Sequence, residues 1–140
     1  MTHPLRTIAV GYDGSEPATV AIRWALAFAH RVGSDVVVVH ALGLLSRLEG
    51  DVTPSLLDTV HDLADEAGLA PDRWRWHVAD GDACSVLLRA AGEPINADLL
   101  VVGSRGQSAH AGLLLGSTSL QLAERSTVPL VIVPWGRDGD

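Results

Sequence analysis

Lysine is absent from this chain of 140 residues, and all ten of its strongly basic side chains are arginines. Without lysine, the chain has neither the phosphate-binding lysine of a Walker A loop nor the amine needed for Schiff-base chemistry. A phosphorylated receiver domain is excluded as well, because its chemistry needs a lysine after the last strand of the domain. Three classes of function are thus set aside by one missing residue type.

The sequence also lacks the cysteine and histidine patterns of disulfides and metal-ligand clusters. Cys84 is the only cysteine, which allows no intrachain disulfide and no multi-cysteine metal site, and which favours a cytoplasmic location. The six histidines show neither an H-x3-H nor an H-E-x-x-H spacing. We therefore predict no zinc site.

Long apolar runs and a basic surface are absent too. No run approaches the roughly 18 residues of a membrane-spanning helix, and the amino terminus lacks a secretory signal pattern. The net charge is -7 and the arginines are scattered, so the chain as a whole repels nucleic acid and anionic membranes. We expect a cytoplasmic protein with neither a membrane nor a nucleic acid as partner.

What is present fits one globular domain. Hydrophobic residues make up 47% of the chain and charged residues 19%, and neither a repeat nor a linker divides it. A length of 140 residues is enough for a single core. The prediction is therefore one domain over residues 1–140.

Short apolar runs alternate with stretches of helical period, which predicts an α/β fold with a parallel, doubly wound sheet and helices on both faces. In the run "WRWHV", apolar and polar residues alternate as expected for a half-exposed edge strand. The five predicted strands cover residues 7–11, 35–41, 74–78, 98–103 and 129–134.

The first helix is predicted between Ser15, as its cap, and Gly33, as its end. Its apolar face is expected to contain Ala21, Trp24, Ala25, Phe28 and Val32. Three further helices are expected from Ser55 to Gly68, after Asp82 and from near Ser117.

The stretch "GSRGQSAHAGLLLGS", residues 103–117, links the fourth strand to the last helix. Gly103, Gly106 and Gly116 permit positive φ and close approach of the backbone, and a helix start at Ser117 offers N–H groups and a hydroxyl to an anion. This arrangement predicts phosphate binding. The residues alone leave a second interpretation open, in which these glycines only end a strand, make a turn and start a helix.

The long G-x-x-G-x9-G-S pattern of this stretch occurs together with "VGYDGSEPA" after the first strand and "ADLLVVGSRG" across the fourth. In this combination the chain resembles the ATP-binding branch of the universal stress protein family over nearly its whole length. The resemblance implies the strand order 3-2-1-4-5. It also implies that Gly103, Gly106, Gly116 and Ser117 bind the triphosphate, with Ser104, Arg105 and Thr118 beside them.

The resemblance places the base and the ribose at the other side of the site. Asp13 is expected to accept hydrogen bonds from ribose or adenine, and its alternative role is an Asx turn before the first helix. Ala41 is expected near the base. Gly11 is included in the site, where some members of the family have proline. Mg²⁺ would arrive with ATP, held mostly by phosphate and water.

The predicted function is ATP binding in stress signalling, with weak hydrolysis at most, because no evident catalytic base accompanies the loop. Two alternatives stay open. One is a slow ATPase or phosphotransferase that uses Asp13, and the other is a dimeric interaction module with an empty site.

Assembly is predicted from the last strand. An apolar strand at the edge of a sheet exposes unpaired backbone groups, and residues 130–133 would form such an edge in the implied strand order. Related universal stress proteins dimerise by pairing this strand with its copy. We therefore expect a homodimer through the last strand.

Overall fold

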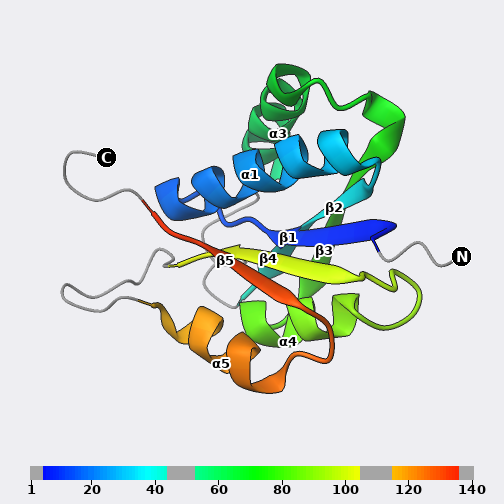
Figure 1. Ribbon diagram of the computed structural model, residues 1–140. Helices are drawn as coiled ribbons and strands as arrows, with labels where there is room; N and C mark the ends of the chain where they lie inside the picture. Colours follow the sequence, from blue (N-terminus) through cyan, green and yellow to red (C-terminus); the bar gives the residue numbers. More distant parts are fainter. Residues whose placement is uncertain (1–4, 44–52, 105–114, 136–140) are drawn as a thin grey trace, which may run out of the picture.

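The fold comes from a computed structural model, which describes residues 5–43, 53–104 and 115–135. Five strands form one parallel sheet in the order β3-β2-β1-β4-β5, which confirms the predicted fold class and order (Figure 1). The strands are β1 (Thr7–Gly11), β2 (Asp35–Leu42), β3 (Trp74–Asp80), β4 (Leu99–Gly103) and β5 (Leu130–Val133). Each boundary lies within two residues of its predicted position.

Helices cover both faces of this sheet (Figure 1). One face carries α1 (Glu16–Val32) and α3 (Thr53–Ala67), and the other carries α4 (Ala83–Ala90) and α5 (Ser117–Arg125). A short 3-10 helix, η1 (Pro71–Arg73), leads into β3. Along the described ranges, no helix combines the length and the apolar composition that a bilayer crossing needs.

The central strands are apolar on both sides because each side faces a layer of helices. In β1, Ile8 and Val10 belong to the core under α1 and α3, whereas Ala9 belongs to the core under α4 and α5. All three residues are fully buried. The alternation of β1 therefore divides the interior into two cores, one on each face of the sheet.

The apolar face of α1 differs from the prediction at two positions. Trp24 is 36% exposed and Val32 is 41% exposed, whereas the sheet is contacted by a narrower stripe of small and branched residues. Trp24 lies about 200° around the helix from Ile22, which points into the core. Trp24 instead stacks on Phe28, with 4.8 Å between ring centroids. The buried stripe contains Ala18, Ala21, Ile22, Ala25, Leu26 and Ala29.

Local capping explains where two of the helices begin. The Ser15 hydroxyl accepts the Ala18 N–H at the start of α1, and the Asp82 carboxylate accepts the Ser85 N–H at the start of α4. Hydrogen bonds from Ser85 hold the pKa of Asp82 below its usual value. Gly33, with φ of 80°, ends α1 in the left-handed conformation that glycine favours. All three positions were predicted from the sequence.

Candidate functional site

The candidate site lies at the carboxyl ends of the strands, where the strand order reverses between β1 and β4. From β1 the chain continues into α1 on one face, and after β4 it returns as α5 on the other face (Figure 1). Open α/β sheets bind ligands in the crevice outside the carboxyl ends at such a point. We call this side of the sheet the carboxyl edge.

The loop after β1 is held by its own short polar residues. The Asp13 Oδ1 atom accepts hydrogen bonds from the Ser15 N–H at 3.0 Å and from the Ser15 hydroxyl at 2.6 Å. These contacts form the Asx turn that was the alternative role of Asp13. Gly14 follows with φ of 84°, and a Cβ atom there would lie 2.8 Å from Leu56 of α3. The turn at Gly14 thus requires glycine.

Gly103 lets the end of β4 approach α1 closely. A Cβ atom at Gly103 would lie 2.6 Å from the Pro17 carbonyl oxygen and 2.9 Å from its carbonyl carbon. Those atoms are backbone in the first turn of α1, so they have little room to move. The close approach predicted for Gly103 is therefore present, and its partner is the protein backbone.

Gly103 and Ser104 also connect β4 to α5 and to the end of β5. The Gly103 carbonyl accepts the Ser119 hydroxyl at 2.8 Å, and the Ser104 carbonyl accepts the Gly116 N–H at 2.6 Å. The buried Ser104 hydroxyl accepts the Trp135 N–H at 3.2 Å. The bond between Ser104 and Gly116 brings together the two ends of the glycine-rich segment, as phosphate binding from both ends requires.

The backbone at Gly116 corrects one prediction. Gly116 is the N-cap of α5 with φ of -77° and ψ of 169°, an extended conformation that any residue adopts. The positive φ expected at Gly116 is thus wrong, and Gly103 is likewise not among the glycines with positive φ. Arg105 and Gly106, the other predicted residues of this loop, lie outside the described residues.

The first turn of α5 differs from those of α1 and α4. Within the described residues, no side chain caps the start of α5, whereas Ser15 caps α1 and Asp82 caps α4. The first N–H groups of a helix have no partner inside the helix, and they sit at the positive end of its dipole. Ser117 is exposed and Thr118 is half-buried. Their hydroxyls and N–H groups can therefore serve an anion.

Ala41 extends β2 past the end of β1. The last pair in register between these strands is Gly11 with Val39, and the Val39 carbonyl accepts the Tyr12 N–H. Alternate residues of a strand direct their backbone groups to the same neighbour, so those of Ala41 point to the side where β1 has ended. Gly11 packs against α4, since a Cβ atom added to it would lie 3.0 Å from the Leu87 side chain. Ala41 is thus placed to offer backbone groups to a planar ligand.

Two residues that shape this edge were missed in the sequence. Ser119 binds the end of β4, and the buried His40 places its Nδ1 atom 2.9 Å from the Tyr12 carbonyl oxygen. Ser119 lies in the first turn of a predicted helix, and His40 was considered only as a metal ligand. Neither contact has a local sequence signal, because each joins elements that are distant in the chain.

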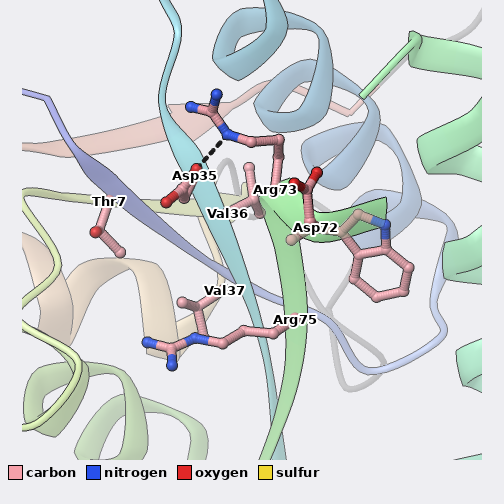
Figure 2. A pocket seen from close by; sticks show the side chains of 8 residues that line it. Thr7, Asp35, Val36, Val37, Asp72, Arg73 and Arg75 are labelled. Atoms are coloured by element: carbon pink, nitrogen blue, oxygen red, sulfur yellow. Dashed lines mark hydrogen bonds and ion pairs between the residues drawn. The ribbon is translucent and has the colours of Figure 1, made fainter. Parts of the chain in front are cut away.

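A hollow lies at the opposite ends of the strands, a side of the sheet that we call the amino edge. It has a volume of about 340 Å³ and opens where β1, β2 and β3 begin (Figure 2). Two arginines and two aspartates surround it, so it has no net charge to select an anion. The labelled lining residues are Thr7, Asp35, Val36, Val37, Asp72, Arg73 and Arg75.

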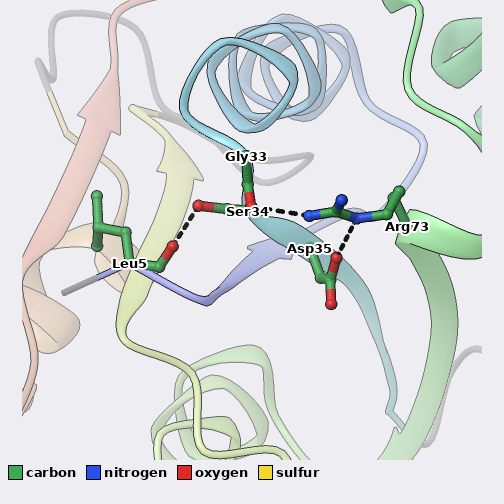
Figure 3. Close-up of polar contacts among 5 residues, drawn as sticks. All are labelled: Leu5, Gly33, Ser34, Asp35 and Arg73. Atoms are coloured by element: carbon green, nitrogen blue, oxygen red, sulfur yellow. Dashed lines mark hydrogen bonds and ion pairs between the residues drawn. The ribbon is translucent and has the colours of Figure 1, made fainter. Parts of the chain in front are cut away.

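Arg73 at this edge is occupied by structural contacts. Its Nε atom donates to the Asp35 carboxylate and its Nη2 atom donates to the Gly33 carbonyl at 2.8 Å (Figure 3). The neighbouring Ser34 hydroxyl donates to the Leu5 carbonyl. These bonds fasten η1 and the first described residues to the turn between α1 and β2. The polar side chains of the amino edge are therefore used to hold the structure together. The carboxyl edge is the better candidate for a ligand site.

Comparisons with known proteins agree on one family. A sequence profile of the universal stress protein family matches residues 4–134. A universal stress protein of Thermus aquaticus is 30% identical over 136 residues, which cover 91% of this chain and 98% of that protein. One of Mycobacterium tuberculosis is 29% identical over 144 residues, 94% of this chain but 46% of that protein. The chain thus spans about half the length of the mycobacterial relative.

Solved structures show the same fold. The crystal structure of a universal stress protein in complex with cAMP has a TM-score of 0.77 and 29% sequence identity, and the match covers 94% of this chain and 98% of that one. A universal stress protein from Archaeoglobus fulgidus, with a TM-score of 0.71 and 21% identity over 91% of this chain and 93% of its own, shares the fold.

Proposed function

The chain belongs to the universal stress protein family, and from that premise we propose that it binds an adenine nucleotide, ATP, at the carboxyl edge. The phosphates would bind at the first turn of α5 and the base beside the end of β2. The solved relative with 29% identity that carries cAMP supports an adenine nucleotide as the class of ligand.

The observation that carries this proposal is the uncapped start of α5. The described part of the chain caps α1 with Ser15 and α4 with Asp82, but it leaves the first turn of α5 without a side-chain acceptor. A phosphate would supply that acceptor and would gain from the helix dipole. Ser117 and Thr118 add hydroxyl donors at the same place.

The other predicted residues fit around this anchor. Ala41 directs its backbone groups past the end of β1, where they suit the edge of a base. Asp13 lies in the loop that follows β1, and this loop is part of the carboxyl edge. Ser104 helps to hold the two ends of the glycine-rich segment together. Gly106 stays a predicted phosphate-binding residue, and Arg105 stays a predicted residue beside it. Mg²⁺ would be bound mainly by the phosphates.

We expect binding to exceed hydrolysis. Binding uses backbone N–H groups and hydroxyls, whereas hydrolysis also needs a well-placed general base, and the Asp13 carboxylate is engaged by Ser15 through two hydrogen bonds. The alternative of a slow ATPase or phosphotransferase predicts steady turnover of purified protein that Asp13→Asn eliminates. A turnover of several per second with that dependence would replace our proposal.

Nucleotide occupancy would then act as a signal in a stress response, read by conformation or by a partner. A cytoplasmic location, which the single cysteine favours, stays a prediction. So does the homodimer through β5.

Calorimetric titration of the protein with ATP tests the proposal. We expect saturable binding by the wild type and its loss in Gly116→Val, whose branched side chain would fill the space at the first turn of α5. Valine adopts the extended backbone found at Gly116, so the variant should stay folded. Gly92→Ala, whose Cβ would make only ordinary contact at 3.7 Å, is the control. No heat of binding with wild type would favour a module with an empty site.

A further inference from the structure

His40 is a polar residue in an apolar part of the core. Its side chain is 4% exposed, and it lies on the β2 face that carries Val36 and Val38, under α1 and α3. The imidazole stacks on Trp76 of β3, with 5.6 Å between ring centroids. An aliphatic residue would suit this position better if packing were its purpose.

One hydrogen bond accounts for the polarity of His40. Its Nδ1 atom lies 2.9 Å from the Tyr12 carbonyl oxygen, whereas its buried Nε2 atom has no hydrogen-bond partner among the described residues. A carbonyl oxygen only accepts, so Nδ1 must carry the proton. Burying Nε2 without a partner lowers stability. The ring is therefore retained for its contact with Tyr12.

That contact completes the fixation of one peptide segment. The Tyr12 N–H donates to the Val39 carbonyl at 2.9 Å, and the Tyr12 carbonyl accepts from His40, the next residue of β2. Both backbone groups of Tyr12 are thus held by consecutive residues of β2. Asp13 follows directly, and its carboxylate organises the turn into α1 through Ser15.

We propose that His40 is a positioning residue of the nucleotide site: its Nδ1–H group fixes the Tyr12 carbonyl and thereby the loop that presents Asp13. His40 itself does not contact the ligand. The inference rests on the proposed nucleotide binding at the carboxyl edge. When a loop samples other conformations, the apparent affinity falls by the fraction of the binding-competent form.

Three variants separate the hydrogen bond from packing. In His40→Asn, the side-chain amide can present an N–H group near the position of Nδ1, and in His40→Gln the amide reaches toward the position of Nε2 instead. His40→Leu keeps an apolar side chain of similar size and removes every donor. All three are titrated with ATP by calorimetry, and their unfolding is measured by chemical denaturation.

We expect His40→Asn to bind ATP within about twofold of wild type, and His40→Leu and His40→Gln to bind roughly three- to tenfold more weakly, the factor that one neutral hydrogen bond contributes. This order must hold even if His40→Leu is the more stable protein. Unchanged affinity in His40→Leu, or losses in all three variants that follow their stability alone, would overturn the proposal.

A nuclear magnetic resonance experiment keeps the test independent of ATP. The ¹⁵N shifts of His40 should identify the tautomer protonated at Nδ1, and the amide signals of Asp13 and Ser15 should move in His40→Leu but stay near their wild-type positions in His40→Asn. If wild type bound no ATP while these signals behaved as expected, the proposed function would fail and the loop contact would stand. Unmoved signals in His40→Leu would refute the positioning role itself.

Discussion

At the scale of single residues, Gly103 carries the most structural consequence at the carboxyl edge. It ends β4, touches the backbone of the first turn of α1 and accepts a hydrogen bond from Ser119 of α5. A side chain at this position would separate α1 from the sheet. Because Gly103 has no Cβ atom, it can contact α1 on one face of the sheet and α5 on the other.

Gly103→Ala should lower the free energy of unfolding by about 1–3 kcal/mol, because the new methyl group would overlap the Pro17 carbonyl at 2.6 Å. Gly92→Ala is the matched control, since its Cβ would lie 3.7 Å from the Arg89 carbonyl oxygen. We expect the control to change stability by less than about 0.5 kcal/mol. Equal stabilities of the two variants in urea denaturation would show that the contact at Gly103 is relieved at little cost.

The sequence pattern singled out the glycines of the carboxyl edge, but it predicted only part of the structural role of each. The spacing of Gly103 and Gly116 in a strand-loop-helix context was informative, yet the left-handed conformation belongs to Gly14 and not to Gly116. A backbone angle depends on the direction in which the chain leaves, which residue type alone does not determine. His40 and Ser119 were missed because their partners lie in other elements.

At the scale of the elements, the helices differ in whether a side chain caps their first turn. Asp82 begins α4 with a side-chain cap, whereas the start of α5 has none within the described residues. A cap stabilises a helix and fills the place where an anion would bind. The cap of α4 is therefore expected to stabilise the fold, whereas the start of α5, without a cap among the described residues, is free to bind an anion.

Asp82→Ala should lower the free energy of unfolding by about 1 kcal/mol near neutral pH, and Asp82→Asn, which can still cap, should lower it by less. Because hydrogen bonds to Ser85 lower the pKa of Asp82, its charge-dependent stabilisation is complete above the usual value of 3.8 and is lost as the pH falls below it. Denaturation at several pH values should show wild type losing its advantage over Asp82→Asn in acid. A constant difference would contradict the assignment.

The existence and order of the elements were predictable because continuous apolar strands and periodic helices have clear signatures. The buried face of α1 was less so. Its pattern allowed a stripe through Trp24, but alanines bring the helix closer to the sheet, and the indole is left at the flank against Phe28. Such a choice depends on the spacing between layers, which local periodicity does not contain.

At the scale of the whole molecule, β5 forms one edge of the sheet. The Pro129 carbonyl accepts from Leu100 and the Val133 carbonyl accepts from Ser104, so the odd-numbered residues of β5 face β4. Leu130 and Ile132 therefore direct their backbone groups outward. An apolar edge of this kind favours pairing with a second copy.

Ile132→Pro should weaken the proposed homodimer, because it removes an outward N–H group and leaves the bonds between β4 and β5 in place. Val131→Pro is the contrasting variant, and it should destabilise the fold itself. Light scattering at micromolar concentration is expected to give twice the chain mass for wild type and a lower mass for Ile132→Pro. A monomeric wild type would refute pairing through β5.

The central claim is that an adenine nucleotide binds at the carboxyl edge, and amide shift mapping during an ATP titration tests it most directly. The signals of Ala41, Ser117 and Thr118 should move together and saturate with one nucleotide per chain, while those of Ser34 and Arg73 at the amino edge stay in place. Shifts confined to Ser34 and Arg73, or no shifts with ATP, ADP, AMP and cAMP, would contradict the account.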